Sequence, residues 1–274
     1  MNDIPGTMKS MGLYLHVDRV ASELRELGDG PLVPADLAAF DQLHYHGTEA
    51  VDAAVQTLGI GNGCSVLEVG SGFGGPARWI AATAGATVTA LELQEDHHRA
   101  AVTLTKRCRL ADRVEHICGD ALDHEWDGQL FDAVVSWLAL YHIPNRPRLL
   151  DRIRTVLPVG GQAYVEDLCA GPALAERDWA EMSTELAASH LPGIGRYRDE
   201  FDEAGFEVVD FDDLTADWAA FTRDRLESYD ADRTRHLRVH GSEVVDTMRA
   251  FYARMVRLLG DGVLAGVRLH ARRI

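Results

Sequence analysis

Positive charge is scarce in this sequence. Its 274 residues include 27 lysines and arginines against 43 aspartates and glutamates, which gives a formal net charge of −16. Because phosphate binding rests on clustered lysines and arginines, this balance argues against nucleic acid or an anionic membrane as a partner. The charge is compatible with a neutral or cationic small substrate.

Long apolar runs and cysteines are few as well. No apolar run approaches the length of a membrane span, and residues 1–10 lack the basic and apolar segments of a signal peptide. The four cysteines form no Cys-x-x-Cys pair, so we expect neither a disulfide framework nor a zinc site, and we expect a cytoplasmic location. A chain of this length buries a full core without such supports.

Strands alternate with helices from about residue 65 onward. Strands are predicted at residues 66–69, 86–92, 114–118, 131–136, 162–167, 206–214 and 262–272. The alternation of polar and apolar residues in the last of these predicts a half-exposed strand. Repeated alternation of strand and helix implies an α/β fold, with a parallel sheet covered by helices on both faces.

The most informative segment is residues 68–75, which read Glu-Val-Gly-Ser-Gly-Phe-Gly-Gly. A short buried strand that runs into a glycine turn and then a helix is typical of a nucleotide-cofactor loop. Two patterns fit these residues. The Gly-x-Gly-x-x-Gly that begins at Gly70 is the dinucleotide fingerprint of a dehydrogenase. The Glu-x-Gly-x-Gly-x-Gly that begins at Glu68 is the first motif of methyltransferases that use S-adenosylmethionine (SAM).

Two acidic residues, Glu68 and Asp120, favour SAM, and a third, Glu92, fits either cofactor. Glu68 stands where a dinucleotide fold has an apolar residue, and its carboxylate can reach toward the positively charged amino-acid end of SAM. Glu92 ends the second strand, where an acid binds the ribose hydroxyls of either cofactor. Asp120 follows the third strand, where an adenine amino group would lie, and a dehydrogenase does not need it.

Five motifs in order resemble the core of the class I SAM-dependent methyltransferases. They are residues 66–74, 88–92, 119–121, 131–136 and 157–162. The resemblance implies a Rossmann-like, doubly wound sheet of seven strands whose last strand is antiparallel. It also implies SAM as the cofactor and S-adenosyl-L-homocysteine as the product.

Shorter segments resemble the small-molecule branch of this family. Residues 40–50 are similar to the Asp-Gln-x-His-x-x-Gly segment of sarcosine/dimethylglycine N-methyltransferases. Residues 140–144 resemble a segment shared by those enzymes, phosphoethanolamine methyltransferases and ubiquinone/menaquinone methyltransferases. The chain end, residues 262–272, resembles small-molecule members that include sugar O-methyltransferases. An amine nitrogen of a sarcosine- or dimethylglycine-like compound is therefore our first choice of acceptor.

Other functions fit the sequence too. An oxygen or carbon acceptor in a secondary metabolite is the nearest alternative. An NAD-dependent oxidoreductase is the rival from another class, and a non-catalytic SAM-binding module is a third. A small-molecule acceptor is the expected partner, and a homo-oligomer is compatible with the sequence.

The resemblance places the cofactor contacts at the ends of the strands. The residues expected to line the SAM site are Glu68, Gly70, Ser71, Gly72, Gly74, Glu92, Leu93, Asp120 and Ala121. Ser136 and Trp137 would close the strand tip that faces the methyl group. Gln42 would reach the cofactor or substrate from the N-terminal segment.

His142 is the first candidate for a catalytic base or orienting group. It follows the fourth strand, at the sheet edge where such folds bind ligands. Tyr141 is the alternative, because a phenol can shape the site or help to move a proton. A purely structural role for His142, in capping the loop before Pro144, fits the sequence as well as a catalytic role does. No metal is expected, since His44 and His46 have no third ligand at a suitable spacing.

Substrate contacts are expected from segments around the core. His44 touches cofactor or substrate if the N-terminal segment closes over the cleft, and Tyr14 is a further candidate. Tyr197, in a glycine-rich loop, and Trp218 are candidates to surround a methylated cation, although aromatic residues more often pack in a core. Arg196 would bind a substrate carboxylate, although a solvated surface position is the default.

The start of the helix that begins near residue 96 is polar. His97 and His98 are therefore expected to be exposed and to have no chemical role.

The chain divides into core segments and helical additions. The expected division is an N-terminal helical lid at 1–60, the SAM-binding core at 61–170, a lid insertion at 171–197, the continued core at 198–214, a helical insertion at 215–261 and the last core strand at 262–274.

Overall fold

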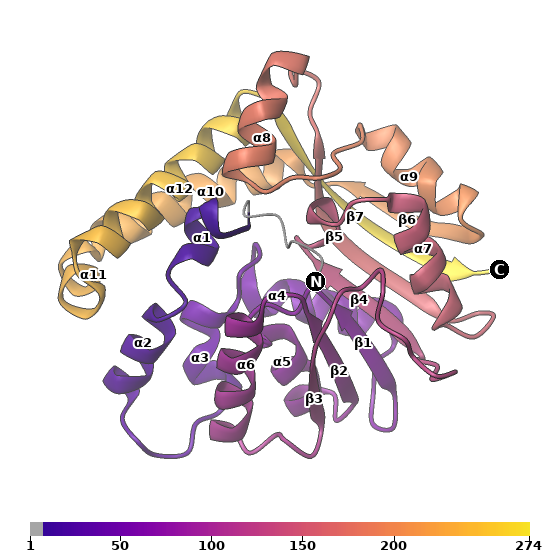
Figure 1. Cartoon of the computed structure of the whole chain (residues 1–274), viewed down its shortest axis with the longest axis horizontal. Helices are drawn as coiled ribbons and strands as arrows, with labels where there is room; N and C mark the ends of the chain where they lie inside the picture. The colour runs from indigo at the N-terminus through magenta and orange to yellow at the C-terminus, as the bar shows by residue number, and fades with distance from the viewer. Residues whose placement is uncertain (1–7) are drawn as a thin grey trace.

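The computed structural model describes residues 8–274, which form one seven-stranded sheet with helices on both faces (Figure 1). The strand order is β3-β2-β1-β4-β5-β7-β6. The strands are β1 (Ser65–Val69), β2 (Thr87–Glu92), β3 (Val114–Cys118), β4 (Ala133–Trp137), β5 (Gln162–Ala170), β6 (Phe206–Asp213) and β7 (Leu264–Arg273). Pairing is parallel from β3 to β5, and β7 runs antiparallel to both β5 and β6. The predicted Rossmann-like sheet with an antiparallel last strand is confirmed.

The helices fall into two groups. Those of the core are α5 (Gly75–Thr83), α6 (Glu95–Arg107), α7 (Arg146–Thr155) and α9 (Ile194–Glu203), with the short 3-10 helix η2 (Leu140–His142). Those outside the core are η1 (Met8–Ser10), α1 (Gly12–Leu15), α2 (Arg19–Leu27), α3 (Pro34–Asp41), α4 (Gly47–Leu58), η3 (Glu176–Asp178), α8 (Trp179–Glu185), α10 (Thr215–Ala231), α11 (Arg233–His240) and α12 (Ser242–Gly260).

The central strands are buried on both faces, as their continuous apolar sequences require in a parallel sheet. Side chains alternate across β1, so Val66 packs with α4 and α5 on one face, while Leu67 packs with α7 and α9 on the other. Both faces are therefore covered, and the carboxyl ends of β1, β2 and β4 meet at one edge of the sheet.

The final strand is less exposed than its alternating sequence predicted. Most of β7 is buried, whereas β6 has the more exposed residues. The reason is the strand order, which places β7 inside the sheet and leaves β6 at the edge. On one face Trp218 of α10 lies so close to Gly266 that a Cβ there would meet ring carbons at 2.2–2.7 Å.

Four of the outer helices, α1, α8, α10 and α12, contribute to one apolar cluster, which we call the lid cluster. Its buried residues include Met11, Leu13 and Tyr14 from around α1, Met182 and Leu186 from around α8, Trp218 from α10, and Met248, Phe251 and Met255 from α12. Figure 1 shows α1, α10 and α12 together at the upper left of the molecule. Segments far apart in the sequence thus form one cover beside the sheet edge.

A buried ion pair joins the N-terminal segment to the core. Arg78 of α5 donates to Asp41 at the end of α3 at 2.8 Å, and the two side chains are 0% and 1% exposed. Arg78 also donates to Thr105 Oγ1 of α6 at 3.1 Å. Helix α3 is therefore held against the helix that follows the glycine loop.

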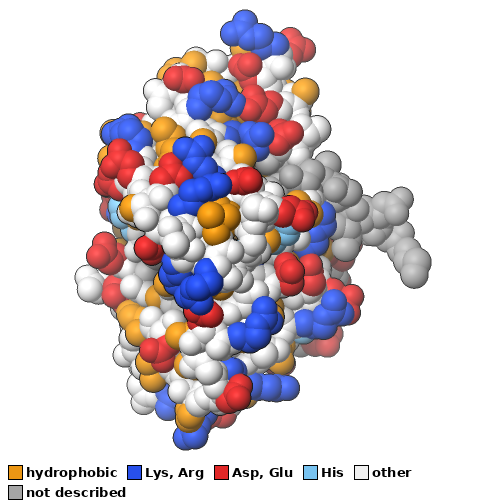
Figure 2. Space-filling view, turned by 90° about the vertical axis from the view of Figure 1, so that its left-hand side faces the viewer, with side chains coloured by type: hydrophobic (Ala, Val, Ile, Leu, Met, Phe, Trp, Pro, Cys, Tyr) orange, Lys and Arg blue, Asp and Glu red, His pale blue; other side chains and the backbone are white. Residues whose placement is uncertain are grey.

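The outer surface mixes charges of both signs. On the face that lies to the left in Figure 1, basic and acidic side chains alternate (Figure 2). Part of this pattern is explained by ion pairs between α2 and α11, in which Arg235 binds Glu23 and Arg238 binds Glu26. Within residues 8–274, no helix is both long and apolar enough to cross a membrane.

Candidate active site

The glycine loop between β1 and α5 adopts a backbone that other residues rarely take. Gly70, Gly72 and Gly74 have φ of 75°, 54° and 71°. At Gly70 a Cβ would also lie 2.2 Å from the Cβ of Ala139. The loop therefore needs glycine both for its φ values and for close contact with the segment after β4.

Glu92 fastens this loop to the end of β2. Its Oε2 accepts a hydrogen bond from the Gly72 amide at 2.8 Å, and its Oε1 accepts one from the Gln94 amide at 2.8 Å. Burial raises the pKa of this carboxyl to about 7. Each carboxylate oxygen keeps a further lone pair, so the group can still accept hydrogen bonds from a ligand.

Glu68 lies in a strongly desolvated position at the end of β1. Its side chain is 2% exposed, and burial raises its pKa to about 8 despite the opposing effect of Arg78. Its Oε2 is buried without a hydrogen-bond partner. A buried acceptor of this kind favours a ligand that brings a cation or a hydrogen-bond donor.

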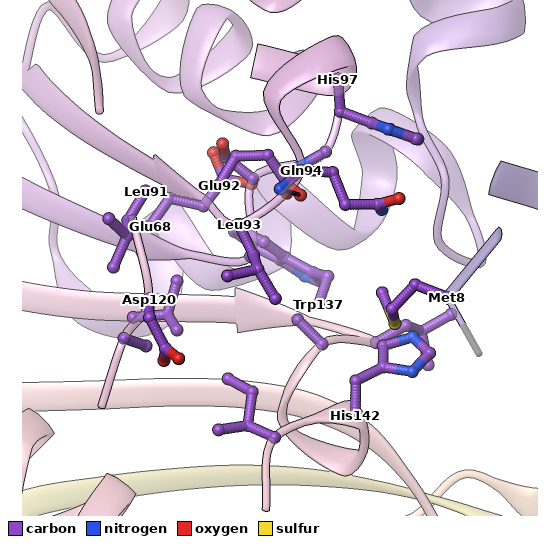
Figure 3. Close-up of a pocket in the computed structure, with 18 of the residues that line it drawn as sticks. Met8, Glu68, Leu91, Glu92, Leu93, Gln94, His97, Asp120, Trp137 and His142 are labelled. Atoms are coloured by element: carbon purple, nitrogen blue, oxygen red, sulfur yellow. Dashed lines mark hydrogen bonds between the residues drawn. The ribbon is translucent and has the colours of Figure 1, made fainter. Parts of the chain in front are cut away.

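A cavity of about 430 Å³ opens at this sheet edge, beneath the outer helices. Figure 3 shows Glu68, Glu92 and Asp120 in one part of it and Met8 and His142 in another, with Trp137 between them. The predicted residues that line it are Tyr14, His44, Glu68, Gly70, Ser71, Gly72, Glu92, Leu93, Asp120, Ala121, Trp137 and His142. Asp120 is oriented by the Leu122 amide, which donates to Oδ1 at 2.8 Å.

His142 and Tyr14 form a hydrogen-bonded pair on the cavity wall. His142 Nδ1 lies 3.0 Å from the Ala187 carbonyl oxygen, which only accepts, so this nitrogen carries the proton. His142 Nε2 then presents a lone pair to the Tyr14 hydroxyl, 3.1 Å away. Burial lowers the pKa of His142 to about 4 and raises that of Tyr14, so both are neutral at neutral pH.

His44 is the second imidazole at the cavity. Its Nε2 lies 2.9 Å from the Gly47 carbonyl oxygen, and its ring centroid is 5.6 Å from that of Trp137. Burial lowers the pKa of His44 to about 4. His46 points elsewhere and pairs with Asp217 at 2.6 Å. Within residues 8–274, no three His, Cys, Asp or Glu side chains are grouped as a metal site.

A third imidazole corrects the sequence analysis. His97 was expected to be exposed, but it is 0% exposed, stacks on Phe73 and lines the cavity. The reason is the face it occupies on α6, which it shares with the buried residues Ala101 and Leu104. That spacing of four and seven residues was the signal that could have found it.

Other cavity residues were not predicted at all. They are Met8, Asp41, Leu43, Val69, Pro76, Leu91, Gln94, Gly119, Leu122, Asp123, Leu138, Ala139, Ile143, Pro144, Arg148, Ala187 and Ser189. Most belong to loops and outer helices, where sequence motifs give no guide to which side chain faces inward.

Several predicted contacts lie outside the cavity. Tyr141 is 2% exposed and packs in the lid cluster, while its carbonyl accepts from the Ser189 and His190 amides. Ser136 donates to the Val69 carbonyl at 2.8 Å within the sheet. Gly74 faces His116 instead, and the buried amide group of Gln42 lies beside Gly75.

The three substrate candidates after residue 190 are also placed elsewhere. Tyr197 lies inside α9 rather than in a loop, fully buried, and donates to Asp167 at 2.9 Å. Trp218 is 1% exposed against Gly266, and Arg196 pairs with Glu203 on the outer surface. Packing and surface ion pairing explain these residues, and none of the three lines this cavity.

The sequence and the fold were compared with known proteins. Residues 66–161 match the family model described as a methyltransferase domain. The glycine/sarcosine/dimethylglycine N-methyltransferase of Actinopolyspora halophila is 28% identical over 150 residues, which are 55% of this chain and 26% of that protein. A sterol 24-C-methyltransferase of Gibberella zeae is 30% identical over 165 residues, 58% of this chain and 43% of that protein. The chain thus spans less than half the length of these two relatives.

The fold itself has solved counterparts. Phosphoethanolamine N-methyltransferase 2 of Haemonchus contortus, solved in complex with S-adenosyl-L-methionine, superposes with a TM-score of 0.79 at 18% identity, covering 95% of this chain and 60% of that one. At that identity the likeness concerns the fold. The matched domain contains the glycine loop, Glu92 and Asp120. Residues 66–161 therefore match a methyltransferase domain, and the fold of the chain is that of the solved methyltransferase.

Proposed function

We propose that this chain binds SAM in the cavity at the ends of β1, β2 and β4 and transfers its methyl group to a small molecule. The observation that carries the proposal is that one cavity joins the glycine loop, Glu92 and Asp120 to the Tyr14–His142 pair. The matched methyltransferase domain supports the same reading.

The residues present fit SAM as the cofactor. The unpartnered Oε2 of Glu68 is suited to the cationic amino-acid end, Glu92 to the ribose hydroxyls and Asp120 to the adenine amino group. When bound, SAM supplies a methyl group made electrophilic by the sulfonium. The protein then has to orient the acceptor and exclude water, since orientation supplies much of the barrier lowering in such a displacement.

The Tyr14–His142 pair supplies a route for the acceptor's proton. The Tyr14 oxygen accepts a hydrogen bond from the acceptor's O–H or N–H, while its own proton points at the His142 lone pair. As the acceptor atom loses its proton, Tyr14 takes it up and passes its own to His142, which ends as imidazolium. Burial lowers the pKa of His142 to about 4, so the imidazolium then loses its proton to solvent and the neutral Tyr14–His142 pair is restored.

The chemical class of the acceptor is a separate question from the methyl-transfer activity. An amine nitrogen of a sarcosine- or dimethylglycine-like compound is the candidate from the sequence, and the Actinopolyspora halophila relative supports it. An oxygen or carbon acceptor is the alternative, supported for carbon by the sterol methyltransferase relative. The proton route serves acceptors whose reacting atom carries a proton, such as a hydroxyl or a secondary amine, whereas a dimethylglycine-like tertiary amine would attack without it.

Two measurements test the proposal. Calorimetry should show SAM binding and no comparable binding of NADH, whereas NADH binding alone would return the glycine loop to a dinucleotide role. A screen with methyl-labelled SAM over amines, phenols, sugars and keto acids should then find an acceptor. SAM affinity without transfer to any member of a broad panel would identify a non-catalytic SAM-binding module.

His142→Ala separates proton handling from cofactor binding. We expect turnover to fall by about a hundredfold or more, the usual contribution of a positioned proton acceptor, while the Kd of SAM changes little. Tyr14→Phe should lower turnover as well, because it keeps the ring and removes the relay oxygen. His236→Ala is the matched control, since His236 stacks on Tyr229 outside the cavity. Unchanged turnover in His142→Ala would remove that residue from the mechanism.

A further inference from the structure

Resting on the proposed function, we propose that the acceptor is an uncharged, mainly apolar molecule without a carboxylate or phosphate group. The cavity that would hold it combines several carboxyl groups, three neutral imidazoles and an apolar wall. This narrows the acceptor class and departs from the sarcosine-like compound that the sequence favoured, whose carboxylate requires a cationic partner.

Carboxyl groups are the most numerous ionisable side chains of the cavity. Five acidic residues line it: Asp41, Glu68, Glu92, Asp120 and Asp123. A carboxyl group is neutral or negative and never positive, so none of them attracts an anion. Like charges brought together in a desolvated site oppose binding strongly. Cationic SAM relieves this repulsion, but an anionic acceptor adds to it.

The positive side chains nearest the cavity are Arg148, Lys9 and Arg78, each paired with an acid, and Arg19, which lies over the ring of Phe73 and does not line the cavity. Arg148 is the one arginine among the described lining residues, is half exposed and pairs with Asp123 at 2.5 Å. Lys9, beside the cavity residue Met8, pairs with Asp96 at 2.5 Å. Arg196, which the sequence assigned to a substrate carboxylate, pairs with Glu203 away from the cavity. Residues 1–7 contain no lysine or arginine.

The imidazoles do not supply a cation either. His44, His97 and His142 all line the cavity, and burial lowers the pKa of each to about 4. They are therefore neutral at neutral pH and offer hydrogen bonds rather than charge.

The wall near His142 is apolar. Figure 3 shows Met8 and His142 at the same end of the cavity, away from Asp120. Further lining residues from the loops after α3 and β4 are Leu43, Leu138, Ile143 and Pro144. Burial of apolar acceptor surface against these side chains is favourable, whereas burial of an unpaired carboxylate is not. The Tyr14 oxygen is left as the polar contact for one hydroxyl or amine.

Matched acceptor pairs test this inference. Methyl caffeate and caffeic acid share a catechol, and methyl 4-(methylamino)benzoate and 4-(methylamino)benzoic acid share a secondary amine that is unprotonated at neutral pH, so each pair differs in one carboxylate. With methyl-labelled SAM we expect the ester to exceed the acid in kcat/KM by more than about tenfold in whichever pair is methylated. The same comparison is extended to a panel of uncharged phenols, alcohols, enols and amines with their acids.

A charge introduced into the wall gives an independent test. Met8→Arg places a cation at the His142 end, and Met8→Gln is the uncharged control of similar length. We expect Met8→Arg to shift the acid-to-ester ratio toward the acid by about tenfold, and Met8→Gln to leave it near the wild-type value. Equal ratios in the two variants would show that charge does not select the acceptor and would overturn the inference.

The outcomes also separate this inference from the proposed function. Methyl transfer confined to carboxylate or phosphate acceptors, or absent from every uncharged compound while SAM binds, overturns the acceptor class. Failure of SAM to bind in calorimetry overturns the proposed function itself. Transfer to uncharged acceptors with the expected ester preference supports both.

Discussion

At the residue scale, the site depends on carboxyl groups that are costly to ionise in the absence of a ligand. Glu68 shows this most clearly, because its buried Oε2 has no partner and burial raises its pKa to about 8. A functional site commonly contains such a group, since a ligand of opposite charge repays the cost on binding. Glu68 thus connects the stability of the free protein to the cofactor it is proposed to bind.

The raised pKa of Glu68 predicts a pH dependence of stability. A carboxyl whose pKa is raised on folding contributes stability that is present below its unfolded pKa of about 4.5 and lost as pH rises through about 8. For Glu68 this loss is on the order of 3 kcal/mol in the free energy of unfolding between pH 5 and 8. Glu92, with a pKa raised to about 7, contributes in the same direction.

Urea denaturation at several pH values measures this loss. Glu68→Gln should flatten the decline in the free energy of unfolding between pH 5 and 8. Glu115→Gln, at an exposed position of β3, is the matched control and should keep the wild-type slope. An equal slope in wild type and Glu68→Gln would contradict the prediction.

At the element scale, helices are joined by a few buried polar contacts whose partners are distant in sequence. The Arg78–Asp41 pair is the central example, since it joins α5, α3 and, through Thr105, α6. Both helix α5 and the end of α3 border the glycine loop. The pair therefore positions the loop and the N-terminal segment together.

Breaking this pair should be strongly destabilising. Arg78→Met leaves Asp41 buried without its counterion, and we expect a loss of about 3–5 kcal/mol in the free energy of unfolding. Arg99→Met, which breaks the exposed Arg99–Glu95 pair on α6, should cost less than about 1 kcal/mol. Chemical denaturation of the two variants checks the contrast, and equal losses would show that burial is not the deciding factor.

Sequence periodicity predicted where the strands lie better than it predicted which side chains contact one another. The strands lie within a few residues of the predicted ranges, because apolar spacing and glycine turns are local properties. Tyr197 shows the limit of this approach. Two nearby glycines predicted a loop, but Gly193 is the N-cap of α9, and Tyr197 is buried inside the helix.

At the scale of the whole molecule, a cover of outer helices lies beside the edge of a conserved type of sheet. Met8 and Tyr14 reach the cavity from this cover, and the lid cluster joins α1 to α10 and α12. A ligand bound in the cavity would contact residues of this cover and should then hold it in place.

Hydrogen exchange with and without SAM measures this effect. We expect SAM to slow amide exchange in residues 8–15 and in residues 138–143, which line the cavity or adjoin its lining residues. Exchange in the edge strand β6 should change little, because no residue of that strand lines the cavity. Equal slowing throughout the chain would contradict a local role for the cover.

The sequence by itself determined the type of fold and the residues of the part of the cavity that is proposed to bind the cofactor. Glu68, Glu92 and Asp120 each follow or end a strand at a fixed place relative to the glycine loop, and a parallel sheet brings such strand ends together. Their positions therefore follow from the order of local motifs. The prediction for His97 was wrong because its neighbours in the sequence are polar, although it lies on the buried face of α6.

Tertiary structure alone decided which residues line the part of the cavity that is proposed for the acceptor. Tyr14 and His142 are separated by 128 positions in the sequence, yet they share a hydrogen bond. Trp218 and Tyr197, which the sequence offered as substrate contacts, are buried in the core. Local patterns cannot distinguish these cases, because which side chain reaches the cavity depends on how the outer helices pack against the sheet.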